Sequence, residues 1–311
     1  MFPAAAVAVL WTSSAACAGA DQRQGLQNLR SADSRLAQVA GRIVVANARL
    51  CERLMPAIGA TLHALDQYAP QFQPEATSEL GFETLIAVEA TVPGGPADQA
   101  GIRPGDGFLA INEVELPRIN LAERATSASR DAAERAIADL PPDQPIALRF
   151  VRKGQIARVI VQPVAACRTR FEVLPAKRLM ARSNGETIQI SSGFVTRFDD
   201  SALAVAFAHE LAHTILKHRA MLEAAGHRGR LSADQVPKRQ LVLMAEREAD
   251  RLSVQLLANA GYDPAIAPQF WREFGAQLSP AIFSDGTHDS AKVRSAALDA
   301  EIALIQRRQP H

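Results

Sequence analysis

The chain has 311 residues, which is enough for two domains of about 150 residues each. Its hydrophobic residues (48%) and charged residues (22%) are balanced as in a globular protein, so a mainly disordered chain is excluded. There are 34 Lys and Arg residues against 33 Asp and Glu residues. The resulting net charge of +1 excludes the broad positive field that nonspecific nucleic-acid binding requires.

The N-terminus has the pattern of an export signal. Residues 1–20 are apolar or small, carry no charged side chain and end in Ala18-Gly19-Ala20, which predicts a signal peptide. We therefore expect an exported protein of the periplasm or cell envelope, with no transmembrane span in the mature chain. No Lys or Arg lies near Met1, and an ordinary N-terminal helix is the alternative. Ala15-Ala16-Cys17 resembles the end of a bacterial lipoprotein signal, so lipid anchoring through Cys17 is a second interpretation.

Three cysteines are too few for a disulfide framework, but they permit one bond. If export removes Cys17, Cys51 and Cys167 remain as an even pair in an oxidising compartment. We expect them to form a disulfide that pins the N-terminal helix to the start of the C-terminal part of the chain. Two buried free thiols are the alternative, because separation in sequence does not fix distance.

The N-terminal region is predicted to be helical. Apolar residues recur at helical spacing over residues 31–55, and Pro56 interrupts the pattern. A shorter helical piece is expected up to Tyr68, and the Pro-containing polar stretch after it predicts a linker. We assign residues 21–78 to an N-terminal helical segment and linker.

Residues 79–165 have the pattern of short strands and turns. Two β-rich runs flank Lys153-Gly154, which predicts a hairpin. Leu80-Gly81-Phe82, a Gly-Pro-Ala-Asp-Gln-Ala-Gly-Ile segment at 95–102, a tight Gly105-Asp106 turn and a strand follow in order. This order resembles a PDZ domain of the type found in bacterial periplasmic proteases.

The PDZ resemblance implies a peptide-binding groove. A ligand would add as a strand between residues 83–88 and a helix at 131–139, with its end held by the backbone amides of Leu80, Gly81 and Phe82. Glu79 departs from the pattern, because its charge disfavours a carboxylate there. The alternative is a module that only packs against its neighbour.

His209-Glu210-Leu211-Ala212-His213 lies in a predicted helix that Asp199, Asp200 or Ser201 can cap and that runs to about residue 220. His209 and His213 are four residues apart, so both imidazoles lie on one helical face and can bind one metal ion. Glu210 lies beside that face, where its carboxylate can take a proton from water at the metal. His218 is five residues after His213, which turns it off the metal face and favours a surface or packing role.

The next predicted helix, residues 238–260, supplies carboxylates. Glu246 and Asp250 share one face of it. Glu246 would complete a three-ligand site with an open fourth position, the arrangement of catalytic zinc sites. Asp250 is placed to accept the outer N–H of a ligand histidine and to fix its ring. The alternative is a solvated charge cluster beside a surface histidine pair.

The HExxH segment with the downstream Glu246 resembles the zinc metallopeptidase family that contains HtpX, BepA, the Oma-type mitochondrial peptidases and the CAAX prenyl protease. The resemblance covers most of residues 167–311. It implies one Zn²⁺ per chain with His209, His213 and Glu246 as ligands, Glu210 as general base, and a cleft that takes an extended peptide. The N-terminal helix also resembles that of soluble members, so the PDZ-like module looks inserted into the peptidase.

Two further segments resemble this family. The strand after Asn184-Gly185 is similar to the segment whose edge strand lines the substrate cleft. Thr287-His288 and Arg294 resemble the family's Thr-His-Pro segment and downstream arginine, but Asp289 replaces the proline. As a catalytic residue, His288 would donate a hydrogen bond to the oxyanion, whereas as a fourth zinc ligand it would hold the enzyme latent. A residue at a helix start is the third interpretation.

These features predict an α+β fold. A mostly helical zincin-type metallopeptidase domain with a small edge-strand sheet is expected to carry an inserted β-rich PDZ-like domain. We expect a zinc-dependent endopeptidase that hydrolyses peptide bonds in unfolded or misassembled envelope proteins, with no nucleic-acid partner. The alternative is a PDZ-bearing chaperone or assembly factor with a latent zinc site, and intact Glu210 favours the enzyme.

Overall fold

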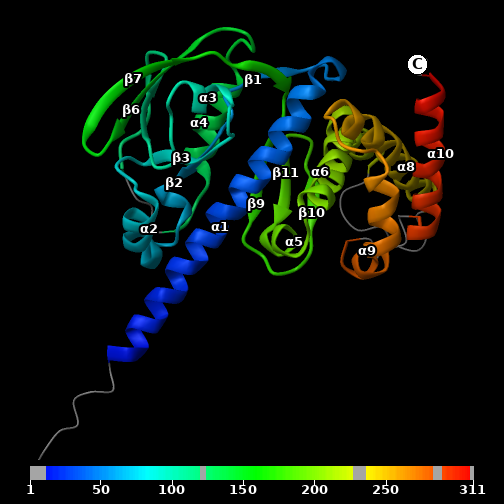
Figure 1. Ribbon diagram of the computed structural model, residues 1–311, viewed down its shortest axis with the longest axis horizontal. Coiled ribbons are helices and arrows are strands. Elements are labelled where there is room, and N and C mark those ends of the chain that lie inside the picture. Colours follow the sequence, from blue (N-terminus) through cyan, green and yellow to red (C-terminus); the bar gives the residue numbers. More distant parts are fainter. Residues whose placement is uncertain (1–11, 120–123, 227–235, 283–288, 309–311) are drawn as a thin grey trace, which may run out of the picture.

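The computed structural model describes residues 12–119, 124–226, 236–282 and 289–308 (Figure 1). The fold is α+β, as the sequence predicts. Two units each bury a hydrophobic cluster of their own. We call residues 58–163 the β-rich unit, and we call the first helix together with residues 168–308 the helical unit. Both names refer to the described residues.

Helices and strands are interspersed along the chain. The helices are α1 (Thr12–Ala46), α2 (Gln73–Leu80), α3 (Pro96–Gln99), α4 (Ala128–Ala138), α5 (Ser192–Arg197), α6 (Asp200–Ile215), α7 (His218–Ala224), α8 (Val236–Asn259), α9 (Ile266–Ile282) and α10 (Ala291–Arg308). The strands are β1 (Leu54–Ala57), β2 (Ala60–Ala64), β3 (Ile86–Thr91), β4 (Gly107–Ile111), β5 (Val114–Glu115), β6 (Ile146–Arg152), β7 (Gln155–Val161), β8 (Val164–Cys167), β9 (Arg170–Leu174), β10 (Ala181–Ser183) and β11 (Thr187–Ser191). Short 3-10 turns cover Ala48–Leu50, Leu65–Gln67 and Pro70–Phe72.

The β-rich unit is built on a six-stranded sheet. Its strands follow the order β2-β3-β4-β6-β7, and β5 pairs with β4. The predicted hairpin is confirmed, because β6 and β7 are joined by Lys153 and Gly154 with φ angles of 50° and 72°. β2 is the terminal strand of this sheet, so one of its edges has no strand partner among the described residues.

This sheet begins earlier in the chain than the sequence indicates. Residues 56–68, predicted as a helical piece, contribute to β1 and β2, and part of the predicted linker forms α2. Leu62 in β2 lies opposite Val88 in β3 and is buried. Because α2 separates the two strands, no short hairpin turn marks their pairing in the sequence. The β-rich unit therefore starts near Ile58 and not at residue 79.

The helix predicted over residues 31–55 differs at both ends. α1 begins at Thr12, so it includes residues 12–20 of the predicted signal peptide, while residues 1–11 lie outside the described part. The helix ends at Ala46. The side-chain amide of the next residue, Asn47, donates from Nδ2 to Ile43 O at 2.9 Å and to Leu256 O at 3.0 Å. This tie between α1 and α8 depends on a contact that local sequence does not reveal.

A two-stranded ribbon connects the units. β1 and β8 pair antiparallel, with Leu54 opposite Cys167 and Ala57 opposite Val164. Cys51 and Cys167 form a disulfide at the root of this ribbon, with a Cα–Cα distance of 5.4 Å. The predicted pairing of these cysteines is therefore confirmed, and the bond ties the segment after α1 to the start of the helical unit.

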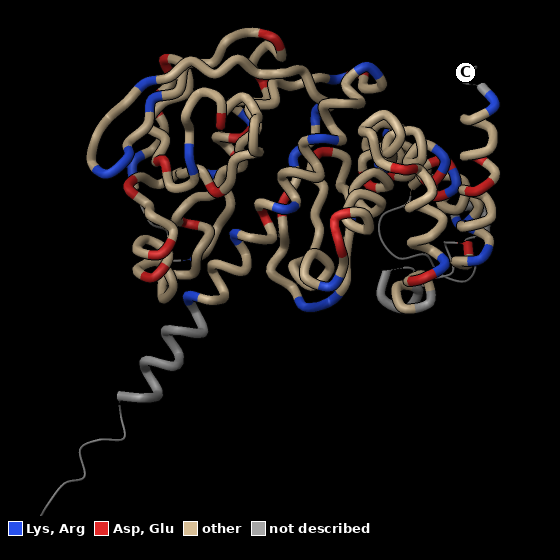
Figure 2. The backbone as a smooth tube through the Cα atoms, viewed as in Figure 1, with Lys and Arg blue, Asp and Glu red and all other residues tan. Residues whose placement is uncertain are grey.

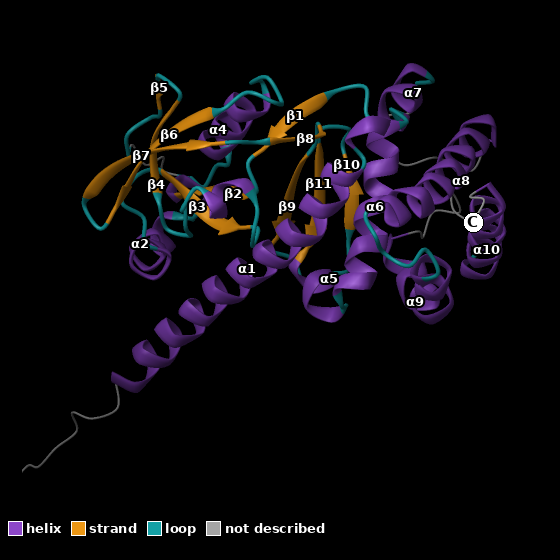
Figure 3. Cartoon of the chain, turned by 45° about the horizontal axis from the view of Figure 1, so that its top comes forward, coloured by secondary structure: helices purple, strands orange, loops and turns teal. Residues whose placement is uncertain are grey.

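The helical unit carries a three-stranded sheet in the order β10-β11-β9 (Figure 3). β10 and β11 are antiparallel and joined through the predicted Asn184-Gly185 turn, whereas β9 is parallel to β11. α6 packs along β10 and against α8. Leu203, Phe207 and Leu211 are fully buried, because α6 is apolar on several sides and lies in the middle of the unit.

Charges are interspersed over both units (Figure 2). Basic and acidic residues both occur in each unit and do not gather on one of them, in keeping with the net charge of +1. Among the described helices, none combines the length and the apolar character needed to cross a bilayer.

Candidate metal centre

The candidate metal centre lies on α6. The Asp199 side chain caps this helix by accepting from Ala202 N at 2.9 Å, as the sequence predicts. The apolar run after the cap places His209 in the interior, where it is 8% exposed. His213 follows one turn later on the same face.

The two histidines converge with Glu246 of α8. His209 Nε2 lies 3.1 Å from His213 Nε2 and 3.2 Å from a Glu246 oxygen, and His213 Nε2 lies 3.4 Å from the other oxygen. In a tetrahedral zinc site with bonds of about 2.0 to 2.1 Å, neighbouring ligand atoms lie about 3.3 to 3.4 Å apart. Two imidazole nitrogens that face each other this closely repel unless a proton or a cation lies between them. The donor set therefore fits a metal ion.

The outer nitrogen of His209 lies next to Asp250 and Arg294. Its Nδ1 lies 3.0 Å from an Asp250 oxygen and 3.4 Å from Nη2 of Arg294. Arg294 in α10 also donates through Nε to Asp250 at 2.7 Å, and its guanidinium lies 3.6 Å from the ring centre of Trp271. Asp250 and Arg294, both singled out from the sequence, are thus brought to the same histidine.

The outer nitrogen of His213 faces a residue that the sequence did not assign to the site. His218 is buried, and its Nδ1 lies 3.0 Å from His213 Nδ1, while its Nε2 lies 3.2 Å from Glu248. α6 ends at Ile215 and Lys217 adopts a left-handed φ of 55°, so α7 turns the ring back towards the site. Of the two predicted roles for His218, a surface position is wrong, and the buried ring packs against His213. An i+5 spacing gives no signal for this contact unless the helix break is known.

The charges around the site favour a cation. Burial alone would lower the pKa of His209, but the carboxylates of Asp250 and Glu246 outweigh it and raise that pKa to about 10. Burial would raise the pKa of Asp250, yet Arg294 and His209 hold it below the ordinary value. Burial and the neighbouring His213 lower the pKa of His218, which favours the neutral form of this ring.

A small apolar pocket adjoins the centre. It has a volume of about 30 Å³, and Glu210 and His209 line it together with apolar side chains of β10, α6 and α9. Ala181 of β10 forms one wall. An extended chain lying along β10 would therefore have one side chain next to both the metal position and the Glu210 carboxylate.

His288 lies outside the described residues. Its neighbour Asp289 accepts from Arg247 Nε at 2.6 Å, so the chain here is tied to α8 one residue after Glu246.

The structure contradicts the prediction that the loop of Leu80, Gly81 and Phe82 binds a peptide carboxylate. Leu80 and Phe82 are buried in the core of the β-rich unit, and Gly81 ends α2 with φ of 76°. The backbone N–H groups of Gly81 and Phe82 both donate to Thr77 O, at 3.1 and 3.2 Å. These amides close the helix end and are unavailable to a carboxylate.

A second loop has the features expected of such a site. Ile58 and Gly59 precede β2, the terminal strand that faces α4, and their carbonyls accept from Ala97 and Val92. Neither of their own backbone N–H groups has an acceptor within the described chain. In the sequence, the signal for this loop is Ile58-Gly59 directly before a strand. We missed it because this stretch was predicted to be helical.

Comparisons with known proteins concern only part of the chain. No protein-family model matches it, and neither does any curated protein. The HtrA-type protease AlgW, solved with a decapeptide, is 25% identical over 36% of this chain and 30% of its own, with a TM-score of 0.27. The HtrA3 PDZ domain with a phage-derived ligand is 16% identical over 37% of this chain and 90% of its own, with a TM-score of 0.28.

A serine endoprotease from Yersinia pestis is 23% identical over 36% of this chain and 29% of its own, with a TM-score of 0.23. The match thus spans about a third of each of the two protease chains. At these TM-scores the similarity assigns no activity to this chain.

Proposed function

We propose that this protein is a zinc-dependent endopeptidase of the family that contains HtpX, BepA and the CAAX prenyl protease. The observation that carries the proposal is the convergence of His209 Nε2, His213 Nε2 and the Glu246 carboxylate at the spacing of a tetrahedral site, beside Glu210. These three residues would hold one zinc ion per chain. When bound, zinc supplies Lewis-acid chemistry: it polarises the scissile carbonyl and lowers the pKa of water.

The protein's own side chains have distinct tasks in this mechanism. Glu210 takes a proton from the attacking water and delivers it to the leaving amine. Asp250, with Arg294 behind it, orients His209. His218, with Glu248 behind it, orients His213.

The substrate lies along β10 in this proposal. β10 is an edge strand, so an extended chain can add to it by backbone hydrogen bonds and place a small apolar side chain in the pocket beside Glu210. His288 stays a predicted catalytic residue, as oxyanion donor or as latency ligand.

The β-rich unit is proposed to be a PDZ-like module that recruits substrates. Its groove lies between β2 and α4, with Ile58 and Gly59 at the carboxylate end in place of Leu80, Gly81 and Phe82. Unfolded or misassembled proteins of the cell envelope are the proposed substrates, which requires export through residues 1–20, with or without a lipid on Cys17.

Zinc content and casein digestion test the enzyme directly. We expect about one zinc per chain, with digestion that a chelator abolishes and added zinc restores. Glu210→Gln should retain zinc but lose digestion by a factor of about 10² or more, because glutamine cannot take the proton. Glu113→Gln, the same change at an exposed glutamate away from the metal centre, is the matched control. Full digestion by Glu210→Gln would remove this residue from the mechanism, whereas zinc binding without any digestion would favour a chaperone with a latent site.

A further inference from the structure

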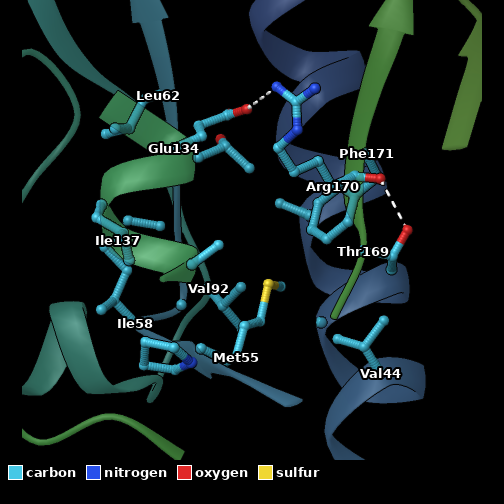
Figure 4. A pocket seen from close by; sticks show the side chains of 18 residues that line it. Val44, Met55, Ile58, Leu62, Val92, Glu134, Ile137, Thr169, Arg170 and Phe171 are labelled. Carbon is cyan, nitrogen blue, oxygen red and sulfur yellow. Dashed lines mark hydrogen bonds and ion pairs between the residues drawn. The ribbon is translucent and has the colours of Figure 1, made fainter. Parts of the chain in front are cut away.

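A channel runs between the two units and is lined by an edge strand from each. β2 ends the six-stranded sheet and β9 ends the three-stranded sheet. Two adjoining cavities separate these strands, one of about 100 Å³ (Figure 4) and one of about 690 Å³. Thr61, Leu62, Glu134 and Phe171 line both of them. We call the two cavities together the inter-unit channel; its size is that of a ligand site.

The two strands run in the same direction along the channel. The smaller cavity contains Ala60 of β2 with Arg170 of β9, and the larger contains His63 of β2 with Glu172 of β9. A chain that lies antiparallel to β2 is therefore also antiparallel to β9. Figure 4 shows the smaller cavity between α4 on one side and β9 with α1 on the other.

β9 turns backbone groups into this channel. Arg170 N–H donates to Glu186 O at 2.9 Å, beside β11, so the alternate residues Phe171 and Val173 face the other way. Val173 N–H donates to the Asp33 side chain at 3.3 Å. Phe171 N–H has no acceptor in the described part of the chain, which leaves it open to a ligand.

β2 also directs backbone groups into the channel, from the opposite side. Leu65 N–H donates to Leu85 O at 2.8 Å, so Leu62 and Ala64 turn their backbone groups away from β3. Ala64 N–H donates to the Gln67 side chain at 2.7 Å. Leu62 therefore presents its backbone to the channel, as Phe171 does from the other edge.

Ion pairs hold the two edges facing each other. Arg130 of α4 lies 2.6 Å from Glu172 of β9, and Arg170 of β9 lies 3.4 Å from Glu134 of α4. On the opposite wall, Arg30 of α1 lies 3.2 Å from Glu89 of β3. All three ion pairs join one unit to the other, so they hold the two walls of the channel together.

One end of the channel suits a carboxylate and an apolar side chain. Ile58 and Gly59 present backbone N–H groups there, and the smaller cavity is lined by Val44, Met55 and Ile137. An adjoining hollow shares Met55 with this cavity and is lined by four arginines: Arg53, Arg135, Arg168 and Arg170. Arg168 and Arg170 are paired with Asp139 and Glu134, and Glu186 lines the hollow as well. Arg53 and Arg135 have no carboxylate partner among the described residues, and their charge favours an anionic group at that end.

We propose that the inter-unit channel binds an extended peptide with a free C-terminal carboxylate and an apolar last residue, and that this peptide hydrogen-bonds to β2 and β9 at once. The inference rests on the PDZ-like groove of the proposed function and adds the second edge. A bound peptide joins the two sheets into one and fixes the units relative to each other. Since β10 and the metal centre lie at the other edge of the three-stranded sheet, this terminus anchors a substrate and is not the segment that is cut.

Backbone methylation of the peptide tests the two edges separately. The probe is a fluorescent peptide of about six residues, the length of a strand, ending in valine. The protein is the full chain with Glu210→Gln, so that the probe is not hydrolysed. Residues along a strand alternate between its two edges, so one peptide is N-methylated at the last residue and every second residue before it, and another at the remaining residues.

We expect each methylated set to weaken binding about fivefold or more in fluorescence anisotropy, since each removes hydrogen bonds to one strand. An amidated terminus should weaken binding about tenfold or more. Hydrogen exchange at both Leu62 and Phe171 should slow on binding.

If only one methylated set weakens binding, β9 takes no part and the two-edge inference is overturned while the PDZ-like groove stands. Equal binding of the amidated peptide overturns the carboxylate site. If no peptide binds, the groove itself fails, and the zinc-dependent digestion of casein still decides the enzyme separately.

Discussion

Each histidine of the candidate metal centre uses one ring nitrogen for the metal position and the other for a neighbouring side chain. With Nε2 as the ligand atom, the proton lies on Nδ1, so His213 donates to His218 Nδ1 and His218 Nε2–H donates to Glu248. His209 donates instead to the charged Asp250. A neutral imidazole and a carboxylate thus fix the two tautomers, and both partners are buried enough to hold the rings in place.

His218→Ala tests the less expected of these partners. Removing the imidazole leaves His213 Nδ1 without its acceptor, so we expect zinc affinity to fall about 10- to 100-fold, measured by competition with a chelator. His218→Asn is the matched variant, because its side-chain oxygen can accept near the position of Nδ1 and should restore most of the affinity. If the alanine variant binds zinc like the natural protein, His218 has only a packing role.

At the scale of elements, the β1–β8 ribbon is the connection that decides how the units are joined. The Cys51–Cys167 disulfide lies at its root and spans a sequence separation of 116 residues. By the chain-entropy model, a crosslink of that span stabilises the native state by about 4 to 5 kcal/mol. We expect the free energy of unfolding in urea to fall by up to this amount on reduction. The Cys51→Ser, Cys167→Ser double variant should be insensitive to reductant, and equal stability of all forms would contradict the estimate.

The same ribbon permits a clean removal of the β-rich unit. Ala57 lies opposite Val164, so an Asn-Gly turn can join β1 to β8 in place of residues 58–163. We expect this variant to retain zinc and cleave a short peptide at close to the natural rate, but to cleave protein substrates about tenfold more slowly or worse, because recruitment is lost. Equal losses on both substrates would show that the unit serves the structure of the helical unit.

At the scale of the whole molecule, the contact between the units contains acids that are buried against one another. Burial raises the pKa of Asp33 on α1 to about 8, assisted by Glu89 of β3 and Glu172 of β9 and opposed by the Val173 N–H and Arg130 of α4. An acid whose pKa is raised in the folded state stabilises that state at low pH. Its contribution is lost as pH rises from about 4, the ordinary pKa, through about 8.

Asp33→Asn should remove part of this pH dependence. Asparagine keeps the acceptor for Val173 N–H but carries no proton to lose. We expect the decline in unfolding free energy between about pH 5 and pH 8 to shrink by about 1 to 2 kcal/mol, which is less than the full pKa shift implies, because Asp33 lines a cavity large enough to admit water. Urea unfolding at both pH values measures it, with the exposed Asp143→Asn as control. If the unfolding free energy falls equally with pH in the natural protein and in Asp33→Asn, the raised pKa does not belong to Asp33.

The sequence by itself determined the features that depend on local spacing. Two histidines four residues apart share a helical face, and Lys153-Gly154 makes a two-residue turn, whatever surrounds them. Glu246 and Asp250 were found the same way, and the even cysteine pair indicated the disulfide. Each of these signals depends only on residues within one helix or turn, or on the chemistry of the residue type.

Tertiary structure decided what depends on partners far apart in the chain. β1 and β2 are strands because β8 and β3 supply their ladders, and the local pattern of residues 56–68 did not reveal either partner. The amides of Gly81 and Phe82 donate to Thr77 O, and for this reason the proposed carboxylate loop is at Ile58 and Gly59 instead. A backbone amide can serve one acceptor well, and which acceptor it serves is settled only when the chain has folded.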